Sequence, residues 1–347
     1  MMVATPNDVQ VQLDQERKLV SFDSYDLSVR QLLDMVESGD IFVPPEYQRQ
    51  FIWDPVRQSA LIESVFLGIP VPSLFMATNS DSTWEVVDGV QRLGTLSHFV
   101  ASVILLEKIS RDKPLTITGL EKLTALNNLT FADFPKSLQL RFFTRPLRVT
   151  VLNDKSDLSV RFDLFERLNT GGVLLTAQEI RNCVYRGPFN DTIKEMSAYP
   201  AFRAVVKIKD GDKNNGMYEE LVLRFLAYLH GYKEFDHSVK EFLNAFMKKY
   251  QKIDIDKVTL KLFREVFDAL MAALPDGISR SRKATPINLF EAVSVGAALA
   301  LRAGSKIDPG LVVALLSDDE LKKFTGAGSN AKRMVIGRIE YTRDKLL

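Results

Sequence analysis

The stretch from Trp84 to Leu93, with the sequence WEVVDGVQRL, constrains the fold of this chain more than any other segment. Its apolar, β-branched residues predict the end of a buried strand, and Asp88-Gly89 is a sharp turn signal. Apolar residues then recur at helical spacing as far as Ile104. The stretch therefore predicts a strand, a tight turn and a helix whose first turn carries Gln91 and Arg92.

Such a turn is a candidate anion site, because a helix N-terminus offers unpaired N–H groups and the positive end of the helix dipole. Arg92 adds a forked donor suited to phosphate. Gly89 has no Cβ, so the backbone can approach a ligand closely there. Taken alone, the pattern fits an ordinary strand-to-helix turn with a surface arginine equally well.

Length and charge limit the classes of protein to consider. At 347 residues the chain exceeds a typical single domain, so two packed units are expected. A formal net charge of +1 gives no global basic field, so any contact with DNA must come from a local patch. The single cysteine excludes an internal disulfide and a multi-cysteine metal site, and the three scattered histidines do not form an H-N-H nuclease centre. A polar N-terminus and the lack of a membrane-length apolar run predict a cytoplasmic protein without a membrane partner.

Changes in pattern predict three parts of the chain. Residues 1–24 are a polar lead-in, and residues 25–205 mix short strands with helices as an α+β unit. Residues 206–347 have helical spacing in nearly every segment, so they predict a mostly α-helical domain. Two basic clusters in that domain, residues 279–283 and 332–338, fit solvated surface better than DNA contacts.

Helix boundaries in the α+β unit are clearly marked. Ser28 and Asp54 are expected N-caps, and Gly39 and Gly68 are expected helix ends. The prolines at 44 and 45 exclude a helix there and predict an extended arm.

Two further polar groups accompany the turn. The first group is on the extended arm, which carries Tyr47, Gln48 and Arg49 in succession. Later, a helix ends at Asn169 before two glycines, and the next helix carries Arg181. Helix capping alone explains Asn169 and the glycines, although it does not require Arg181.

In order along residues 25–200, these motifs resemble the N-terminal domain of GmrSD-type modification-dependent restriction systems. The matching segments are P-x-Y-Q-R-x-F-x-W from Pro45, L-I-E-S from Leu61, G-I-P-x-P from Gly68, V-D-G-x-Q-R-L from Val87, F-x-x-L-N-T-G-G from Phe165 and E-I-R-N from Glu179. Several motifs in one order are far more specific than any single motif.

The resemblance implies a ParB/sulfiredoxin-like nucleotide-binding fold for residues 25–205, followed by the helical domain. It implies a regulatory or sensing module of a prokaryotic anti-phage or restriction system that binds and hydrolyses a nucleoside triphosphate on or near DNA. The predicted catalytic residues are Asp88, Gln91 and Arg92, with Asp88 also the predicted Mg²⁺ ligand. The predicted nucleotide-binding residues are Tyr47, Gln48, Arg49, Gly89, Asn169 and Arg181.

The departures from the family keep alternatives open. Val90 stands where the family has glutamine in its D-G-Q-Q-R turn, so binding without hydrolysis remains an alternative. The family often carries an H-N-H nuclease half, which we do not recognise in this sequence, so the chain is expected to be the regulatory or sensing half, acting either alone or with a separate nuclease subunit. The other readings are a non-hydrolysing ParB-like module that binds DNA or a partner protein, and an interaction protein with a degenerate site. DNA nicking and homo-oligomer formation are left open.

Overall fold

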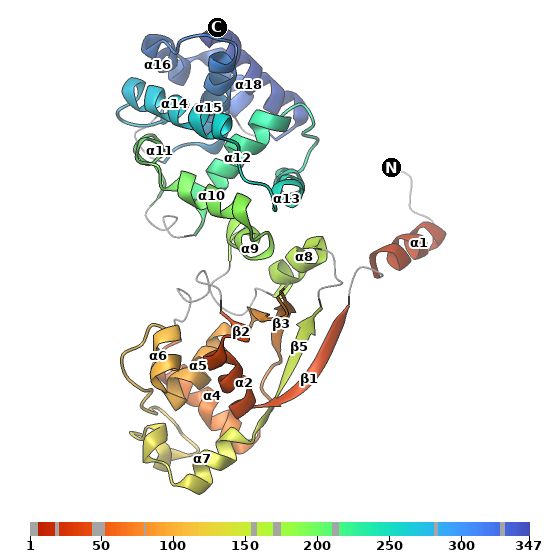
Figure 1. Cartoon of the computed structure of the whole chain (residues 1–347), viewed down its shortest axis with the longest axis vertical. Helices are drawn as coiled ribbons and strands as arrows, with labels where there is room; N and C mark the ends of the chain where they lie inside the picture. The colour runs from red at the N-terminus through yellow and green to blue at the C-terminus, as the bar shows by residue number, and fades with distance from the viewer. Residues whose placement is uncertain are drawn as a thin grey trace. The chain divides into compact units, whose positions relative to one another are not determined.

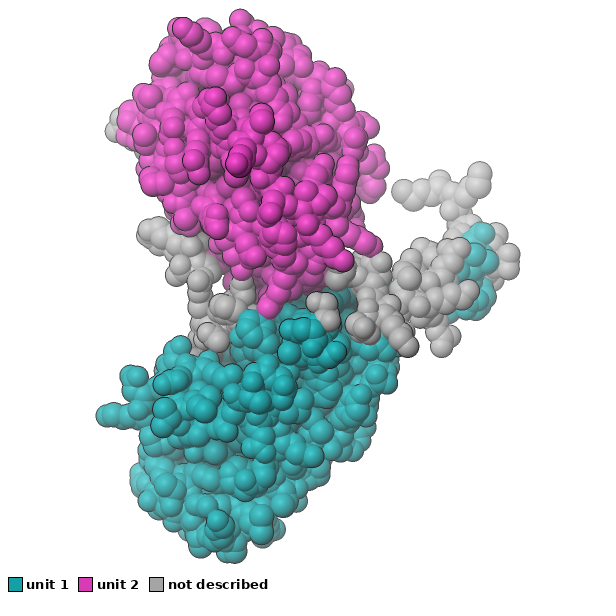
Figure 2. All heavy atoms as spheres, viewed as in Figure 1, with its two compact units in different colours: residues 1–174 teal, residues 175–347 magenta. Residues whose placement is uncertain are grey.

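The computed structural model describes residues 6–17, 21–43, 53–79, 81–153, 158–168, 175–209, 215–280, 284–326 and 330–347. The chain divides into two compact units, residues 1–174 and residues 175–347 (Figure 2). Among the described residues, none of the helices combines the length and the apolar character needed to span a membrane.

The first unit is built on a five-stranded mixed sheet (Figure 1). Its strands are β1 (Phe22–Ser28), β2 (Ile41–Phe42), β3 (Leu74–Thr78), β4 (Trp84–Asp88) and β5 (Pro146–Leu152). They lie in the order β1-β5-β3-β4-β2. β5 pairs antiparallel with β1 and parallel with β3, and β4 pairs antiparallel with β3 and parallel with β2. The predicted lead-in thus contains helix α1 (Pro6–Arg17) and the start of β1.

The strand register places the Asp88 end of β4 beside the start of β3. Asp88 lies opposite Phe75, and Leu74 is the register partner of Val149 in β5. The loop that enters β3 therefore lies at the same end of the strands as the predicted turn.

After α1, the described part of the first unit contains six α-helices, of which three meet in an aromatic core. The six are α2 (Val29–Ser38), α4 (Pro55–Leu67), α5 (Val90–Val100), α6 (Val103–Lys108), α7 (Lys136–Phe143) and α8 (Leu158–Leu168), with two short 3₁₀ turns at Thr124–Leu126 and Phe131–Asp133. Phe99 on α5 lies 5.2 Å from Phe142 and 5.3 Å from Phe131 between ring centroids, in edge-to-face arrangements. Such pairs add about 0.5–1.5 kcal/mol each beyond their area burial, so this cluster fixes α5 against α7.

The predicted helix boundaries are confirmed where the chain is described. Ser28 caps α2 as part of a capping box, and Asp54 caps α4 by accepting the Arg57 N–H at 2.9 Å. α2 ends at Gly39 and α4 at Gly68, and both glycines have a left-handed backbone. The predicted arm with Tyr47 lies outside the described residues.

Every element described in the second unit is a helix, which confirms the predicted helical character of the C-terminal part. The helices are α9 (Ala177–Val184), α10 (Pro188–Ser197), α11 (Pro200–Val205), α12 (Met217–Gly231), α13 (Val239–Tyr250), α14 (Lys257–Ala273), α15 (Ile287–Arg302), α16 (Pro309–Ser317), α17 (Asp319–Thr325) and α18 (Lys332–Leu346). α15 lies at the centre and packs closely on α18, because Gly296 leaves room for Thr342; a Cβ there would lie 2.6 Å from the Thr342 Cβ.

The division between the units differs from the predicted boundary after residue 205. α10 packs on α12, α9 on α12 and α13, and α11 on α14. These three short helices therefore belong to the helical unit. Their amphipathic sequences alone do not tell which later helices will cover them.

Candidate functional site

The predicted turn is present, and Gly89 is the residue that allows it. β4 ends at Asp88 and α5 begins at Val90. Gly89 between them has φ +104° and ψ 12°, a conformation that side chains rarely adopt. A Cβ at this position would also collide with Leu74 Cδ2 and come within 3.3 Å of Arg92 Nε. Backbone conformation and packing therefore both require glycine here.

Asp88 and Arg92 form an ion pair across the turn. Arg92 Nη2 donates to Asp88 Oδ2, and the two side chains are 12% and 28% exposed. Arg92 Nη1 also lies 3.4 Å from the carbonyl oxygen of Pro72, in the loop that enters β3. The guanidinium is thus held beside the N-terminus of α5, in a position accessible to solvent. The arrangement can present a cation, a carboxylate and a helix N-terminus to one ligand.

Gln91 points to the start of α4. Its Oε1 accepts the backbone N–H of Trp53 at 3.1 Å. The carbonyl oxygen of Trp53 accepts a bond of 2.6 Å from Gln58 Nε2 on α4. The backbone of Trp53 is therefore held from both sides, at the point where the described chain resumes after the predicted arm.

A histidine contacts Gln58, the residue that holds the carbonyl oxygen of Trp53. His98 Nδ1 lies 2.8 Å from Gln58 Oε1, and its Nε2 lies 2.9 Å from the Lys113 carbonyl oxygen. Burial lowers the pKa of His98 and the nearby Arg111 lowers it further, while the bond to the Lys113 carbonyl opposes the shift. The net direction is downward, so the neutral ring is favoured in the folded protein.

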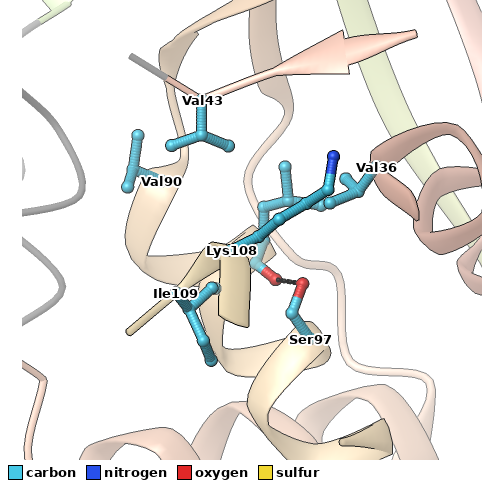
Figure 3. A pocket seen from close by; sticks show the side chains of 8 residues that line it. Val36, Val43, Val90, Ser97, Lys108 and Ile109 are labelled. Carbon is cyan, nitrogen blue, oxygen red and sulfur yellow. Dashed lines mark hydrogen bonds between the residues drawn. The ribbon is translucent and has the colours of Figure 1, made fainter. Parts of the chain in front are cut away.

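Val90 lines an apolar cavity of about 20 Å³ (Figure 3). It lines this space with Val36, Val43 and Ile109. The third position of the turn therefore contributes packing to the core, and no polar group, in this chain.

A buried carboxylate on the same strand as Asp88 was not singled out from the sequence. Glu85, on β4, is fully buried, and its Oε2 lies 3.6 Å from Arg161 Nη2 on α8. Arg161 also donates to the Thr78 carbonyl oxygen at 3.2 Å and to Asn79 Oδ1 at 3.0 Å. This contact fixes α8 to the sheet. A charged residue between Trp84 and the apolar pair Val86 and Val87 was the available signal.

Arg181 lies in the second unit and is 2% exposed. Its Nε donates to Asn244 Oδ1 at 2.8 Å, and its Nη1 lies 3.2 Å from Gln178 Oε1 and 3.3 Å from Glu220 Oε2. Burial lowers the pKa of Arg181, and the Glu220 carboxylate opposes that shift. These contacts join α9 to α12 and α13.

Of the predicted site residues, Asp88, Gly89, Gln91 and Arg92 are brought together in one turn. Tyr47, Gln48, Arg49 and Asn169 lie outside the described residues. Within the described part of the chain, no cluster of three or more histidine, cysteine, aspartate or glutamate side chains could hold a metal ion. Asp88 remains a predicted Mg²⁺ ligand through one carboxylate.

The fold and site define a mixed α/β domain in which an Asp–Arg pair brackets a strand–glycine–helix turn. Residues 29–186, somewhat less than half of the chain, match the family model described as the N-terminal domain of the GmrSD restriction endonuclease. This confirms the resemblance noted in the sequence. The match continues through α9, so it includes the first helix of the second unit.

The other comparisons add less. One solved structure, described as a Pnob8-like ParB-N domain, is 11% identical, and the alignment covers 94% of this chain and 96% of that chain. Its TM-score of 0.23 is too low to carry an argument. No curated protein matches the chain.

Proposed function

We propose that the first unit binds the phosphates of a nucleoside triphosphate at the Asp88–Arg92 turn, as the nucleotide-responsive part of a restriction system acting on or near DNA. The observation that supports this most is the ion pair between Arg92 and Asp88 at the N-terminus of α5. A helix N-terminus and a fixed guanidinium are both favourable for phosphate oxygens. The family match supplies the restriction setting.

In this proposal the pair separates when the ligand arrives. Arg92 exchanges the carboxylate for phosphate oxygens, and Asp88 becomes free to orient a water molecule. A carboxylate together with phosphate oxygens is also the donor set that Mg²⁺ prefers, and Asp88 is partly exposed, so it fits this role. When bound, Mg²⁺ neutralises charge on the phosphates.

Gln91 has a positioning role in this proposal. Its bond to the Trp53 backbone couples the turn to the chain that follows the Tyr47–Arg49 arm. Gln48 and Arg49 remain predicted phosphate contacts, and Tyr47 and Asn169 remain predicted nucleotide contacts. The contacts of Arg181 support a different role, in which it holds α9 within the helical unit.

A second candidate function is binding without hydrolysis, in which the module binds DNA or a partner protein. It is favoured by Val90, which lines an apolar cavity and gives the turn no additional amide. It is also favoured by the engagement of the Asp88 carboxylate with Arg92.

Phosphate release from each nucleoside triphosphate with Mg²⁺ tests the proposal, and thermal shift reports binding separately. We expect Arg92→Gln to lose release by about 100-fold or more, as for removal of a transition-state donor, and Asp88→Asn to lose release as well, because the carboxylate that orients the water is removed. Arg148→Gln is the matched control, because Arg148 forms an exposed ion pair with Asp26 in the same unit. Binding without release selects the second candidate. Neither binding nor release, or equal activity of all variants, rejects the proposal.

A further inference from the structure

Asp88 belongs to a row of side chains that crosses the sheet of the first unit. It is the register partner of Phe75 in β3, and Phe75 is in turn the partner of Thr150 in β5. Ser24 in β1 pairs with Thr150. Residues that lie opposite each other in neighbouring strands project from the same face of a sheet. Asp88, Phe75, Thr150 and Ser24 therefore form one row, which we call the Asp88 row.

A β-bulge puts Asp88 on this face. Val86 pairs with Met76, and both side chains are fully buried in the core. Side chains alternate along a strand, so Asp88, two positions after Val86, would ordinarily point into the same core. Between these pairs β3 advances by one residue while β4 advances by two, so Asp88 becomes the partner of Phe75. Bulges of this kind redirect side chains next to functional sites.

The Asp88 row is accessible to solvent, unlike the row beside it. The Asp88 side chain is 28% exposed, and Phe75 and Thr150 are partly exposed. In the neighbouring row Glu85 is fully buried, and its Oε2 lies 3.6 Å from Arg161 on α8. Helix α8 thus covers the sheet beside the Asp88 row and leaves the ring of Phe75 within reach of a ligand.

Contacts with the turn fix the position of β3. A Cβ on Gly89 would lie 2.3 Å from Leu74 Cδ2, so the residue before Phe75 packs directly on the turn. Two positions earlier, the Pro72 carbonyl oxygen lies 3.4 Å from Arg92 Nη1. The place of Phe75 relative to the turn is therefore set before a ligand binds, which lowers the entropic cost of binding.

The order of groups in the row matches the parts of a nucleotide. Neighbouring strands are about 4.8 Å apart, so Phe75 lies one strand away from the carboxylate of Asp88 at the proposed phosphate site. Its aromatic ring offers an apolar face. Stacking on such a face holds a nucleobase whatever its identity, because every base has a π-face. Beyond the ring, the hydroxyl groups of Thr150 and Ser24 keep the surface polar.

We propose that Phe75 stacks on the base of the nucleoside triphosphate whose phosphates bind at the Asp88–Arg92 turn. The inference rests on the proposed function, because it assigns the base of the same ligand. Phe75 supplies affinity for the nucleoside part of that ligand and none for the phosphates.

The test separates the base from the phosphates by comparing two kinds of probe. Isothermal calorimetry with the full chain and Mg²⁺ measures the affinity of non-hydrolysable analogues of ATP, GTP, CTP and UTP, and that of inorganic tripolyphosphate, which has no base. Phe75→Leu removes the ring and keeps an apolar side chain. We expect it to weaken binding of the nucleotide analogues roughly fivefold or more, and to leave the affinity for tripolyphosphate unchanged.

Matched variants make the outcome specific. Phe75→Tyr keeps the ring, so it should retain the affinity for nucleotide. Phe22→Leu is the control, because Phe22 projects from the same face of the sheet, opposite Leu152, and is 60% exposed. Unchanged binding of tripolyphosphate to Phe75→Leu shows that the turn is still folded in that variant.

The proposal is supported if Phe75→Leu weakens binding of the nucleotide analogues alone, while Phe75→Tyr and Phe22→Leu bind both probes as the wild type does. It is overturned if Phe75→Leu binds the analogues normally, or if it loses tripolyphosphate to the same extent. The phosphate site is judged separately by Arg92→Gln, which should weaken both probes. If neither probe binds the wild-type chain, the proposed function fails together with this inference; if both bind and Phe75→Leu has no effect, this inference fails alone.

Discussion

The side-chain oxygen of Gln91 accepts the backbone N–H of Trp53 at 3.1 Å, across 38 positions of the sequence. The first turn of α5 thereby holds the residue that precedes Asp54, the N-cap of α4. Since Asp88 and Arg92 flank Gln91, a change at the ion pair can be transmitted to Trp53. This relationship gives the site an optical reporter.

Trp53 fluorescence should respond to nucleotide. Trp84, the other tryptophan, stacks on Tyr25 with ring centroids 5.4 Å apart, so Trp84→Phe preserves an aromatic contact and leaves Trp53 as the sole reporter. In that background we expect triphosphate with Mg²⁺ to change the emission of Trp53, and Gln91→Leu to abolish the change. An unaltered response in Gln91→Leu would show that the hydrogen bond between Gln91 and Trp53 does not link Trp53 to the binding site.

Gly89→Ala should destabilise the first unit more than Gly39→Ala. Both glycines have positive φ, of +104° and +89°, but a Cβ at Gly39 meets nothing within 4 Å. Gly39→Ala therefore measures backbone strain alone, about 1–2 kcal/mol, and Gly89→Ala adds the collision with Leu74. Urea unfolding followed by tryptophan fluorescence reports this unit, because both tryptophans lie in it. Equal losses would show that the Leu74 side chain moves aside freely.

Acid should weaken the first unit through His98. The folded protein lowers the pKa of this ring below its ordinary value of 6.5. Between the two pKa values the unfolded chain binds more protons, so stability is full above about pH 6.5 and falls as the pH drops through the folded-state pKa. Thermal unfolding by tryptophan fluorescence at several pH values checks this. A His98→Gln variant should show a shallower loss on acidification, and an unchanged pH dependence would exclude His98 as the cause.

A buried ionic chain should dominate the stability of the second unit. Glu291 is fully buried and binds two arginines, Arg224 at 2.7 Å and Arg338. Glu291→Gln removes the carboxylate that Arg224 and Arg338 share, although Arg224 keeps Glu220 at 2.7 Å, and the expected loss is about 3–5 kcal/mol. Far-UV circular dichroism follows the helices of both units during urea unfolding, and tryptophan fluorescence reports the first unit separately.

The exposed pair of Asp26 and Arg148 provides the contrast. Both side chains are more than half exposed, so Asp26→Asn should cost no more than about 1 kcal/mol. Comparable losses in Glu291→Gln and Asp26→Asn would contradict the expected effect of burial.

Local chemistry predicted the features that depend on neighbours in the sequence. The strand, the glycine turn and the helix around Asp88 follow from residue types within a few positions, and so do the caps at Ser28 and Asp54. The ion pair joins positions four apart on one turn, which a pattern can also suggest.

The remaining features depend on partners far away in the sequence. Nothing around Gln91 indicates that it will bind Trp53, and nothing around Arg181 indicates Asn244 and Glu220, which come from later helices. The order of the motifs agreed with the family model that matches residues 29–186, but it could not separate a ligand-binding residue from a packing residue. The sequence around Val90 likewise does not indicate that this side chain lines an apolar cavity.

The position of β5 has a consequence for how the protein is made. Strand order β1-β5-β3-β4-β2 inserts the last strand to be synthesised between the first and the third. Phe22 must wait for Leu152, its register partner, before β1 can pair. Until then the edges of β1 and β3 that later pair with β5 are open to association with other chains. Closing such a long loop slows folding, so the nascent first unit should need protection by a chaperone until residue 152 has left the ribosome.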